Sequence, residues 1–217
     1  MQAFIFDMDG VIIDSEPVHI RAKKDAFAHF GVPISADAFD AFAGQPAIAM
    51  FRTVLERQRR TDVRPEDLAA YKHARYQELF AAGEVEAVPG SLAFIASLRR
   101  AGIPLALATS SHWQAIRTTQ EKFHLEDAFA VIVAGGDLPK SKPDPAIYRM
   151  AAEKLGAVPA ACVVLEDANA GVRAAKGAGM HCIAYRNPHS GRQDLSMADL
   201  VVDRIADLHV EEIQRRF

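Results

Sequence analysis

The segment AFIFDMDG, residues 3–10, decides the fold of this chain. Four apolar residues in succession indicate a strand that is covered on both faces, as strands of parallel sheets are. Asp7 and Asp9 follow it, and their spacing of two residues directs both side chains to the same side while the backbone stays extended. Gly10 then permits a tight turn. We therefore predict a parallel-sheet strand that ends in two neighbouring carboxylates.

Similar short apolar runs recur along the chain, at residues 105–108, 131–134, 163–165 and 182–185. Helical segments separate them. Asp144 is suited to cap a helix that has Pro145 at its first position and Gly156 just beyond its last turn. Residues 91–101 show the same kind of pattern. This alternation from about residue 88 onward predicts an α/β core, with a doubly wound, Rossmann-like parallel sheet and right-handed crossovers.

Residues 16–85 interrupt this alternation. They contain amphipathic helical stretches and no clear strand; the stretches are residues 18–30, 47–59 and 65–82. We therefore expect two domains, which are an α/β catalytic core of residues 1–15 and 86–217 and an inserted all-helical cap of residues 16–85. The two connections between them are expected to form a hinge over the sheet.

The composition is that of an ordinary folded protein. The 217 residues are 50% hydrophobic and carry a formal net charge of −3, which gives no electrostatic footprint for nucleic acid. The basic run at residues 57–60 fits a solvated helix face. No apolar stretch approaches the ~20 residues that cross a membrane, and no targeting segment precedes the first strand. We expect a cytoplasmic monomer without nucleic-acid or membrane partners, with Cys162 and Cys182 as reduced core residues.

Polar residues follow the predicted strands at four places. These are FIFDMDGVIIDSE (residues 4–16), LATSS (107–111), KSKPDP (140–145) and VVLEDANAGV (163–172). Open parallel sheets bind ligands at the carboxyl ends of their strands, so we expect the four segments to form one site. Glu166 and Asp167 then join Asp7 and Asp9, and four carboxylates repel one another unless a cation is bound. Hard oxygen ligands favour Mg²⁺, which makes these four residues the candidate metal ligands.

Phosphoryl transfer is the chemistry that this set of residues favours. Lys142 and Mg²⁺ together offset most of the carboxylate charge, so that a phosphate dianion can approach. Thr109, Ser110 and Ser111 lie at the start of a helix and are suited to hold phosphate oxygens. A carboxylate can attack phosphorus and form an aspartyl phosphate, and Asp7 is placed to do so. Asp9 is placed to protonate the leaving oxygen and later to activate water.

Four motifs closely resemble those of the haloacid dehalogenase superfamily of phosphohydrolases: DMDGVIIDS, the TSS strand end, the KPDP lysine and LEDANAGV. The resemblance covers nearly the whole chain. It is strongest for the branch with a helical cap after the first motif, which includes phosphoglycolate phosphatases, sugar-phosphate phosphatases and β-phosphoglucomutases. It implies Asp7 as nucleophile, Asp9 as acid/base, Thr109 for phosphate binding and Lys142 for charge balance. It also implies Mg²⁺ on Asp7, Asp167 and the Asp9 carbonyl, with Glu166 either touching the metal or orienting its neighbour.

The residues that choose the substrate are less specific in sequence. The candidates for substrate binding are Gly10, Glu16, His19, Gly44, Gln45, Ser110 and Ser111. His112 and Trp113 are further nominees near the phosphate site. We predict hydrolysis of small phosphate monoesters, sugar phosphates in particular.

Two alternatives stay open. A β-phosphoglucomutase-like activity is suggested by His19, which falls where such mutases carry a histidine. Against it, the chain has Ala43 and Ala47 where the mutase pattern has a lysine and an arginine, and Trp113 near the place of an asparagine. The other alternative is a phospho-accepting signalling module without turnover, because receiver domains also combine aspartates, Ser or Thr, lysine and Mg²⁺. The long helical insertion and the DxD spacing fit that class poorly.

Overall fold

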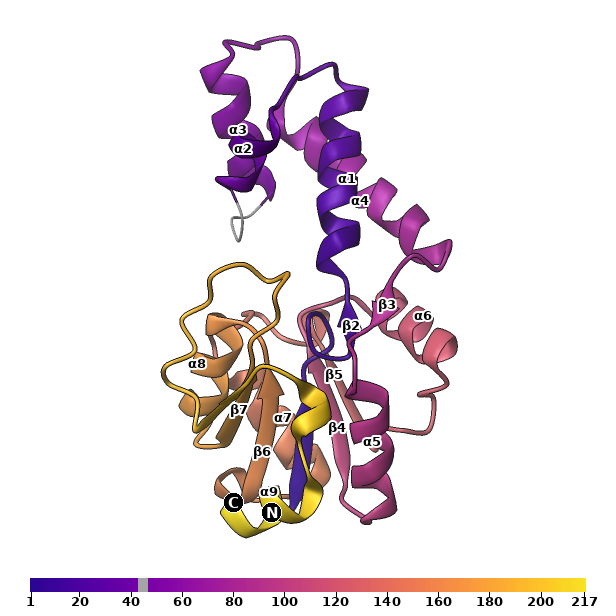
Figure 1. Ribbon diagram of the computed structural model, residues 1–217, viewed down its shortest axis with the longest axis vertical. Helices are drawn as coiled ribbons and strands as arrows, with labels where there is room; N and C mark the ends of the chain where they lie inside the picture. The colour runs from indigo at the N-terminus through magenta and orange to yellow at the C-terminus, as the bar shows by residue number, and fades with distance from the viewer. Residues whose placement is uncertain (43–46) are drawn as a thin grey trace. The chain divides into compact units, whose positions relative to one another are not determined.

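The computed structural model describes residues 1–42 and 47–217 (Figure 1). These residues divide into two compact units. Met1–Asp14 and Ala87–Phe217 form one unit, which we call the core, and Ser15–Glu86 form the other, which we call the cap. In the first unit the chain alternates between strand and helix, and the second is helical.

The core is built on a six-stranded parallel sheet, which confirms the predicted doubly wound α/β fold. Its strand order is β5-β4-β1-β6-β7-β8. The strands are β1 Ala3–Phe6, β4 Leu105–Thr109, β5 Val131–Ala134, β6 Cys162–Glu166, β7 His181–Tyr185 and β8 Leu200–Val202. The edge strand β8 was not expected, because it has three half-buried residues and too little apolar sequence to stand out from its polar surroundings.

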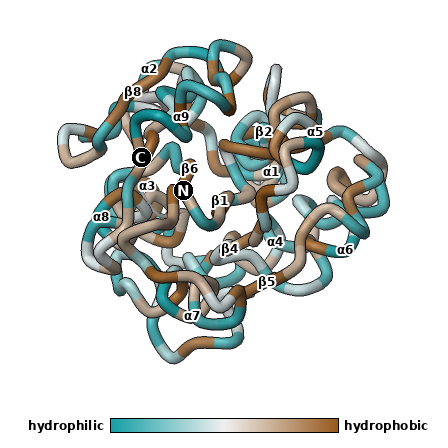
Figure 2. Tube along the Cα trace, turned by 90° about the horizontal axis from the view of Figure 1, so that it is seen from below, coloured by the Kyte–Doolittle hydropathy of each residue, from teal (hydrophilic) through white to brown (hydrophobic). Residues whose placement is uncertain are grey.

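Helices cover both faces of the sheet (Figure 2). On one side lies α5 (Ser91–Arg100), whose Phe94 packs edge-on against Phe4 and Phe6 of β1. On the other side lie α7 (Ala146–Leu155) and α8 (Asn169–Gly177), which bury an apolar layer with β1, β4 and β6. Because both faces are covered, the strands are apolar throughout rather than alternating. The remaining core helices are α6 Trp113–Phe123, α9 Val210–Arg216 and the short 3₁₀ turns Gly135–Asp137, Pro159–Ala161 and Ile205–Asp207.

The predicted ends of α7 are nearly those observed. The helix begins at Ala146, one residue later than expected, so Pro145 lies at the cap position rather than in the first turn. Asp144 still acts at this end, because its Oδ1 accepts a hydrogen bond from the Ala146 backbone N–H at 3.0 Å. Gly156 ends the helix in a left-handed conformation, with φ of 66°.

In its described residues, 15–42 and 47–86, the cap has four helices: α1 Glu16–His29, α2 Ala36–Asp40, α3 Ala47–Arg57 and α4 Pro65–Ala81. They enclose a separate apolar cluster that includes Phe27, Phe51 and Leu68. The short α2 was not expected; it begins where Ser35 Oγ accepts from the Ala38 backbone N–H. Two short strands, β2 Ile13–Asp14 and β3 Glu86–Ala87, pair where the chain leaves and re-enters the core.

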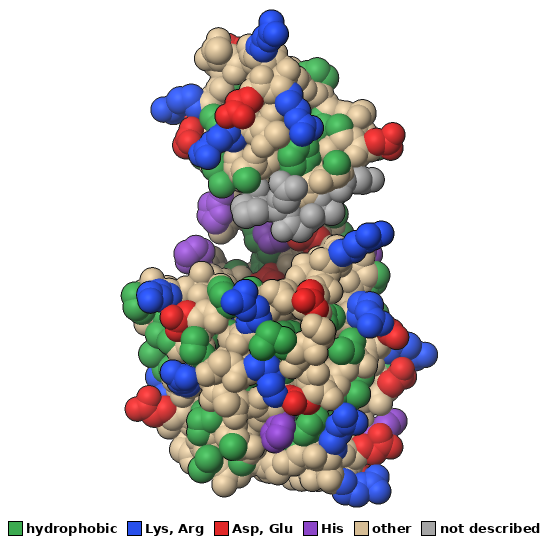
Figure 3. All heavy atoms as spheres, turned by 90° about the vertical axis from the view of Figure 1, so that its left-hand side faces the viewer, with side chains coloured by type: hydrophobic (Ala, Val, Ile, Leu, Met, Phe, Trp, Pro, Cys, Tyr) green, Lys and Arg blue, Asp and Glu red, His purple; other side chains and the backbone are tan. Residues whose placement is uncertain are grey.

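The surface charges, the helices and the two cysteines can be compared with what the composition predicts. On the core face drawn in Figure 3, basic and acidic side chains are interspersed. Within residues 1–42 and 47–217, no helix has the length and apolar character needed to cross a membrane. Cys162 and Cys182 are free and buried in β6 and β7.

Replacing Phe94 by alanine is expected to lower the free energy of unfolding by about 3–5 kcal/mol, because the ring is 3% exposed and fills the space between α5 and β1. Val158→Ala is the control, since Val158 is 56% exposed, and its effect should stay within about 0.5 kcal/mol. Urea unfolding followed by circular dichroism measures both. Equal stability of the two variants would contradict this packing.

Candidate active site

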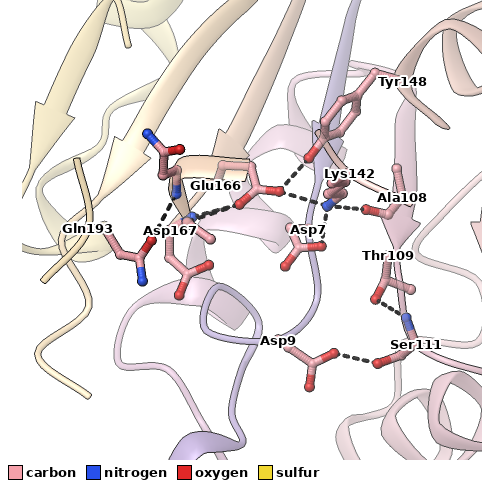
Figure 4. A network of polar contacts seen from close by, with 12 residues as sticks. Asp7, Asp9, Ala108, Thr109, Ser111, Lys142, Tyr148, Glu166, Asp167 and Gln193 are labelled. Atoms are coloured by element: carbon pink, nitrogen blue, oxygen red, sulfur yellow. Dashed lines mark hydrogen bonds and ion pairs between the residues drawn. The ribbon is translucent and has the colours of Figure 1, made fainter. Parts of the chain in front are cut away.

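A lysine joins three adjacent strands at the centre of the site (Figure 4). Asp7 directly follows β1, and Glu166 is the last residue of β6. Lys142, in the loop before α7, places its Nζ 2.6 Å from Asp7 Oδ1 and 2.7 Å from Glu166 Oε1. The same Nζ donates to the carbonyl of Ala108 on β4 at 3.1 Å. The polar residues that were predicted to meet at the carboxyl edge of the sheet do meet there.

Glu166 is held on all sides. Its Oε1 accepts from Lys142 Nζ and also from Tyr148 Oη, at 2.7 Å each. Its Oε2 accepts from the backbone N–H groups of Asp167 and Ala168, at 3.0 and 3.2 Å. Both oxygens of this carboxylate are therefore occupied by donors from the protein, and its orientation is fixed.

Asp7, Glu166 and Asp167 form a buried group that can hold a metal ion. One carboxylate oxygen of each lies within 4.8 Å of the others. Lys142 offsets one of the three negative charges, and the rest stay in a buried place, where charge is costly. A metal cation fits this set, because it would offset the remaining charge and because carboxylate oxygens are ligands for hard cations.

The electrostatics of the group show the same imbalance. Burial raises the pKa of Asp7 well above its usual range, and the charges of Glu166 and Asp167 add to this effect against that of Lys142. Burial, together with the charge of Glu166, raises the pKa of Asp167 to about 7. Burial alone would lower the pKa of Lys142, but the charges of Asp7 and Glu166 outweigh it and raise this pKa, so the ammonium group stays charged.

Gly10 forms a tight turn directly against Asp167. Its φ is 80°, a conformation that residues with a side chain rarely adopt, and a Cβ at this position would lie 2.0 Å from Asp167 Oδ2. The glycine predicted to form a turn after Asp9 therefore also has a packing role. Only a residue without a side chain lets the segment that contains Asp7 and Asp9 approach Asp167 so closely.

Asp9 points away from the carboxylate group and toward β4 (Figure 4). Ser111 Oγ donates to Asp9 Oδ2 at 2.6 Å, and the Ser111 backbone N–H donates to Thr109 Oγ1 at 3.0 Å. Thr109 is buried at the end of β4, whereas Ser110 is exposed. The structure thus brings Asp9, Thr109 and Ser111 together beside Asp7. The Asp9 carboxylate is not part of the group of three that can hold a metal ion.

His112 and Trp113 follow at the start of α6. His112 is exposed, and Trp113 is 41% exposed with its Nε1 donating to Asp137 Oδ1 at 3.2 Å. Neither residue belongs to the buried apolar core, and both directly follow the phosphate-binding candidates of β4 in the sequence.

In the cap, His19 lies in a polar and aromatic cluster. Lys72 Nζ is 2.9 Å from His19 Nδ1, and the His19 ring stacks on Tyr76 with centroids 4.0 Å apart. Burial lowers the pKa of His19 to about 3, with the charges of Lys72 and Lys23 adding to the effect. Because a lysine ammonium can only donate, Nδ1 accepts and the proton of the neutral ring is on Nε2.

The other cap candidates are less informative. Glu16 Oε1 accepts from Lys23 Nζ at 3.1 Å, a local pair within α1. Gly44 and Gln45 lie outside the described residues. The substrate-binding roles of these residues stay predictions.

Sequence reasoning missed four polar residues of these networks: Tyr148, Asn187, Ser190 and Lys72. Tyr148 looked like one more apolar residue of α7, yet its hydroxyl reaches Glu166. Asn187 donates to the Gly10 carbonyl and Ser190 donates to Asp167. Both follow the carboxyl end of β7, so the rule that located the other segments could have located these two as well.

Comparison with known proteins identifies relatives along the whole chain. The family model described as haloacid dehalogenase-like hydrolase matches residues 1–179. A phosphorylated carbohydrates phosphatase of Thermotoga maritima is 35% identical over 88% of this chain and 87% of its own. A crystal structure of a CbbY mutant from Rhodobacter sphaeroides with xylulose-(1,5)bisphosphate has a TM-score of 0.76, with 31% identity and 96% of each chain covered. A putative β-phosphoglucomutase from Thermotoga maritima has a TM-score of 0.82, with 28% identity and both chains fully covered.

The low pKa of His19 predicts a loss of stability in acid. The folded protein keeps His19 neutral down to about pH 3, whereas the unfolded chain protonates it near 6.5, so the unfolded state binds more protons between these values. The free energy of unfolding should therefore fall as the pH falls from about 6.5 toward 3, with His19 contributing up to about 1.4 kcal/mol per pH unit. Urea unfolding at several pH values should show a shallower fall for His19→Gln. Equal slopes would contradict the assigned environment.

Proposed function

Because the chain belongs to the haloacid dehalogenase-like hydrolases, we propose that it is a magnesium-dependent phosphatase that acts on small phosphate monoesters, and on sugar phosphates in particular. The observation that carries this proposal is the buried group of Asp7, Glu166 and Asp167 around Lys142. Two relatives support the substrate class, one of them a phosphorylated carbohydrates phosphatase and the other a protein crystallised with a sugar bisphosphate.

In this proposal Asp7 is the nucleophile. A carboxylate oxygen of Asp7 forms a bond to phosphorus while the bond from phosphorus to the ester oxygen breaks, which leaves an aspartyl phosphate. Lys142 touches Asp7 Oδ1 and so orients the nucleophile, and its positive charge lowers the pKa of Asp7 against the effect of burial. Asp7, Asp167 and the Asp9 carbonyl would hold Mg²⁺, which would supply positive charge for the phosphoryl oxygens.

Asp9 is the proposed acid and base. It gives a proton to the leaving ester oxygen, and in the second step it takes a proton from the water that attacks phosphorus and frees Asp7. The hydrogen bond from Ser111 to Asp9 Oδ2 holds this carboxylate on the side of Asp7 that faces Thr109. Thr109, Ser110 and Ser111 hold the phosphate oxygens in the same proposal.

Glu166 is better suited to positioning than to metal binding. Its two oxygens already accept four hydrogen bonds, from Lys142, Tyr148 and two backbone N–H groups. We therefore assign the direct metal contacts to Asp7 and Asp167, and to Glu166 the task of holding Lys142 and the backbone at Asp167.

A sugar-phosphate mutase is the second candidate. The pairing of His19 with Lys72 in the cap favours it, because a cation beside an imidazole is suited to bind a second anionic group. So does the likeness to a putative β-phosphoglucomutase. Against it stand Ala43 and Ala47, which offer no cation where the mutase pattern has two. A signalling module without turnover is disfavoured by membership of a hydrolase family.

The test is phosphate release from a panel of sugar phosphates, phosphoglycolate and nucleotides, with Mg²⁺ or with EDTA, alongside interconversion of glucose 1-phosphate and glucose 6-phosphate. Asp7→Asn should lower the rate of release by at least about 10⁴-fold, because it removes the nucleophile. The control is Asp127→Asn, the same chemical change at an exposed residue, which should keep the wild-type rate.

Release of phosphate that survives both EDTA and Asp7→Asn would overturn the mechanism. Interconversion of the two glucose phosphates without release would show a mutase instead. Absence of both reactions with every substrate would revive the signalling alternative.

A further inference from the structure

We propose that Ser190, on the loop after β7, is a positioning residue for the metal site, where it fixes the carboxylate of Asp167. The loop comprises residues 186–199, between β7 and β8. This inference rests on the proposed function, because it assumes that Asp167 is a metal ligand. Ser190 lies outside the four motifs of the sequence.

Ser190 contacts Asp167 directly. Its Oγ donates a hydrogen bond to Asp167 Oδ2. The Gly10 turn lies against the same oxygen, since a Cβ on Gly10 would be 2.0 Å from it. Asp167 Oδ2 is thus enclosed between the first motif on one side and the Ser190 hydroxyl on the other. Of these two contacts, only the hydrogen bond from Ser190 is directional, so it orients the carboxylate.

Asn187 fastens the loop to that turn. It is 4% exposed, its Nδ2 donates to the Gly10 carbonyl at 3.0 Å, and its Oδ1 accepts from the His189 backbone N–H at 2.8 Å. The loop therefore contacts Gly10 through Asn187 and Asp167 through Ser190. Because the buried amide of Asn187 both donates and accepts a hydrogen bond, it fixes the position of the backbone next to Ser190.

The far side of Ser190 is fastened as well. Gln193 Nε2 donates to the Ser190 carbonyl at 2.8 Å, and Gln193 Oε1 accepts from the Asn169 backbone N–H at 3.0 Å. Asn169 begins α8, two residues after Asp167, and its Nδ2 donates to the Asp194 carbonyl at 2.6 Å. The loop thus contacts the helix that follows the metal-ligand candidate, and the side-chain contacts of Asn187, Gln193 and Asn169 together set the distance between Ser190 and Asp167.

The space beside Asp167 explains why a hydroxyl is needed. Asp167 lines a cavity of about 370 Å³ together with Asn187, Arg192, Gln193 and Leu195. Without the Ser190 hydroxyl, the Asp167 carboxylate has room to rotate toward this cavity and away from Asp7. Partners that orient a metal ligand typically change metal affinity about 10–100-fold when they are removed.

The test compares Ser190→Ala with Ser190→Thr, which keeps a hydroxyl, and with Ser196→Ala, which removes an exposed hydroxyl from the same loop. Mn²⁺ binding to the full chain without substrate, followed by electron paramagnetic resonance of the free ion, gives the dissociation constant. We expect a value about 10-fold higher for Ser190→Ala and wild-type values for the other two. The Mg²⁺ concentration at half-maximal phosphate release should rise by the same factor, while kcat at saturating Mg²⁺ falls less.

Each outcome is decisive. Wild-type Mn²⁺ affinity in Ser190→Ala would overturn the role of Ser190 and leave the phosphatase proposal standing. An equal loss of affinity in Ser196→Ala would also overturn it, because the loop as a whole would then be responsible. Absence of Mn²⁺ binding to the wild type would refute the metal site itself, and with it both proposals.

Discussion

The contact of Lys142 with three neighbouring strands is the interaction on which the core depends. Its ammonium lies between Asp7 after β1 and Glu166 on β6, and it also reaches the Ala108 carbonyl of β4. These strands are adjacent in the order β4-β1-β6. Two buried carboxylates at neighbouring strand ends would repel each other, so the sheet order is compatible with this sequence only because a cation lies between them.

That same contact leaves a charge imbalance, and the imbalance connects the fold to the chemistry. Asp167 follows Glu166 and brings a further buried negative charge, which the structure holds against the Gly10 turn. A second cation at this place would restore the balance and would let an anionic phosphate approach Asp7. Both the stability of the core and the proposed catalysis therefore need positive charge at the carboxyl edge of the sheet.

Much of the fold and the centre of the site could be predicted because their signals are local. A run such as Ala3 to Phe6 is apolar because the strand is buried on both faces of the sheet. The residues directly after it lie at the carboxyl edge of the sheet. The predictions for Asp7, Lys142 and Glu166 followed from this rule, and the structure places the three in contact.

The missed features depend on contacts between distant parts of the chain. His19 and Lys72 are 53 residues apart, and Ser190 reaches Asp167 from a loop without periodicity. The position of Tyr148 in α7 fits an ordinary core residue, so the sequence does not reveal that its hydroxyl contacts Glu166. Edge strand β8 and helix α2 are each too short for a periodic pattern to show.

The measurement that tests the central claim most directly is a crystal structure of the protein with Mg²⁺ and beryllium fluoride, a mimic of a phosphoryl group on a carboxylate. We expect the beryllium fluoride group on a carboxylate oxygen of Asp7, with Lys142 still in contact with that residue, and the metal ion bound by Asp7 and Asp167. Beryllium fluoride attached to any other residue, or a metal ion that contacts neither aspartate, would contradict it.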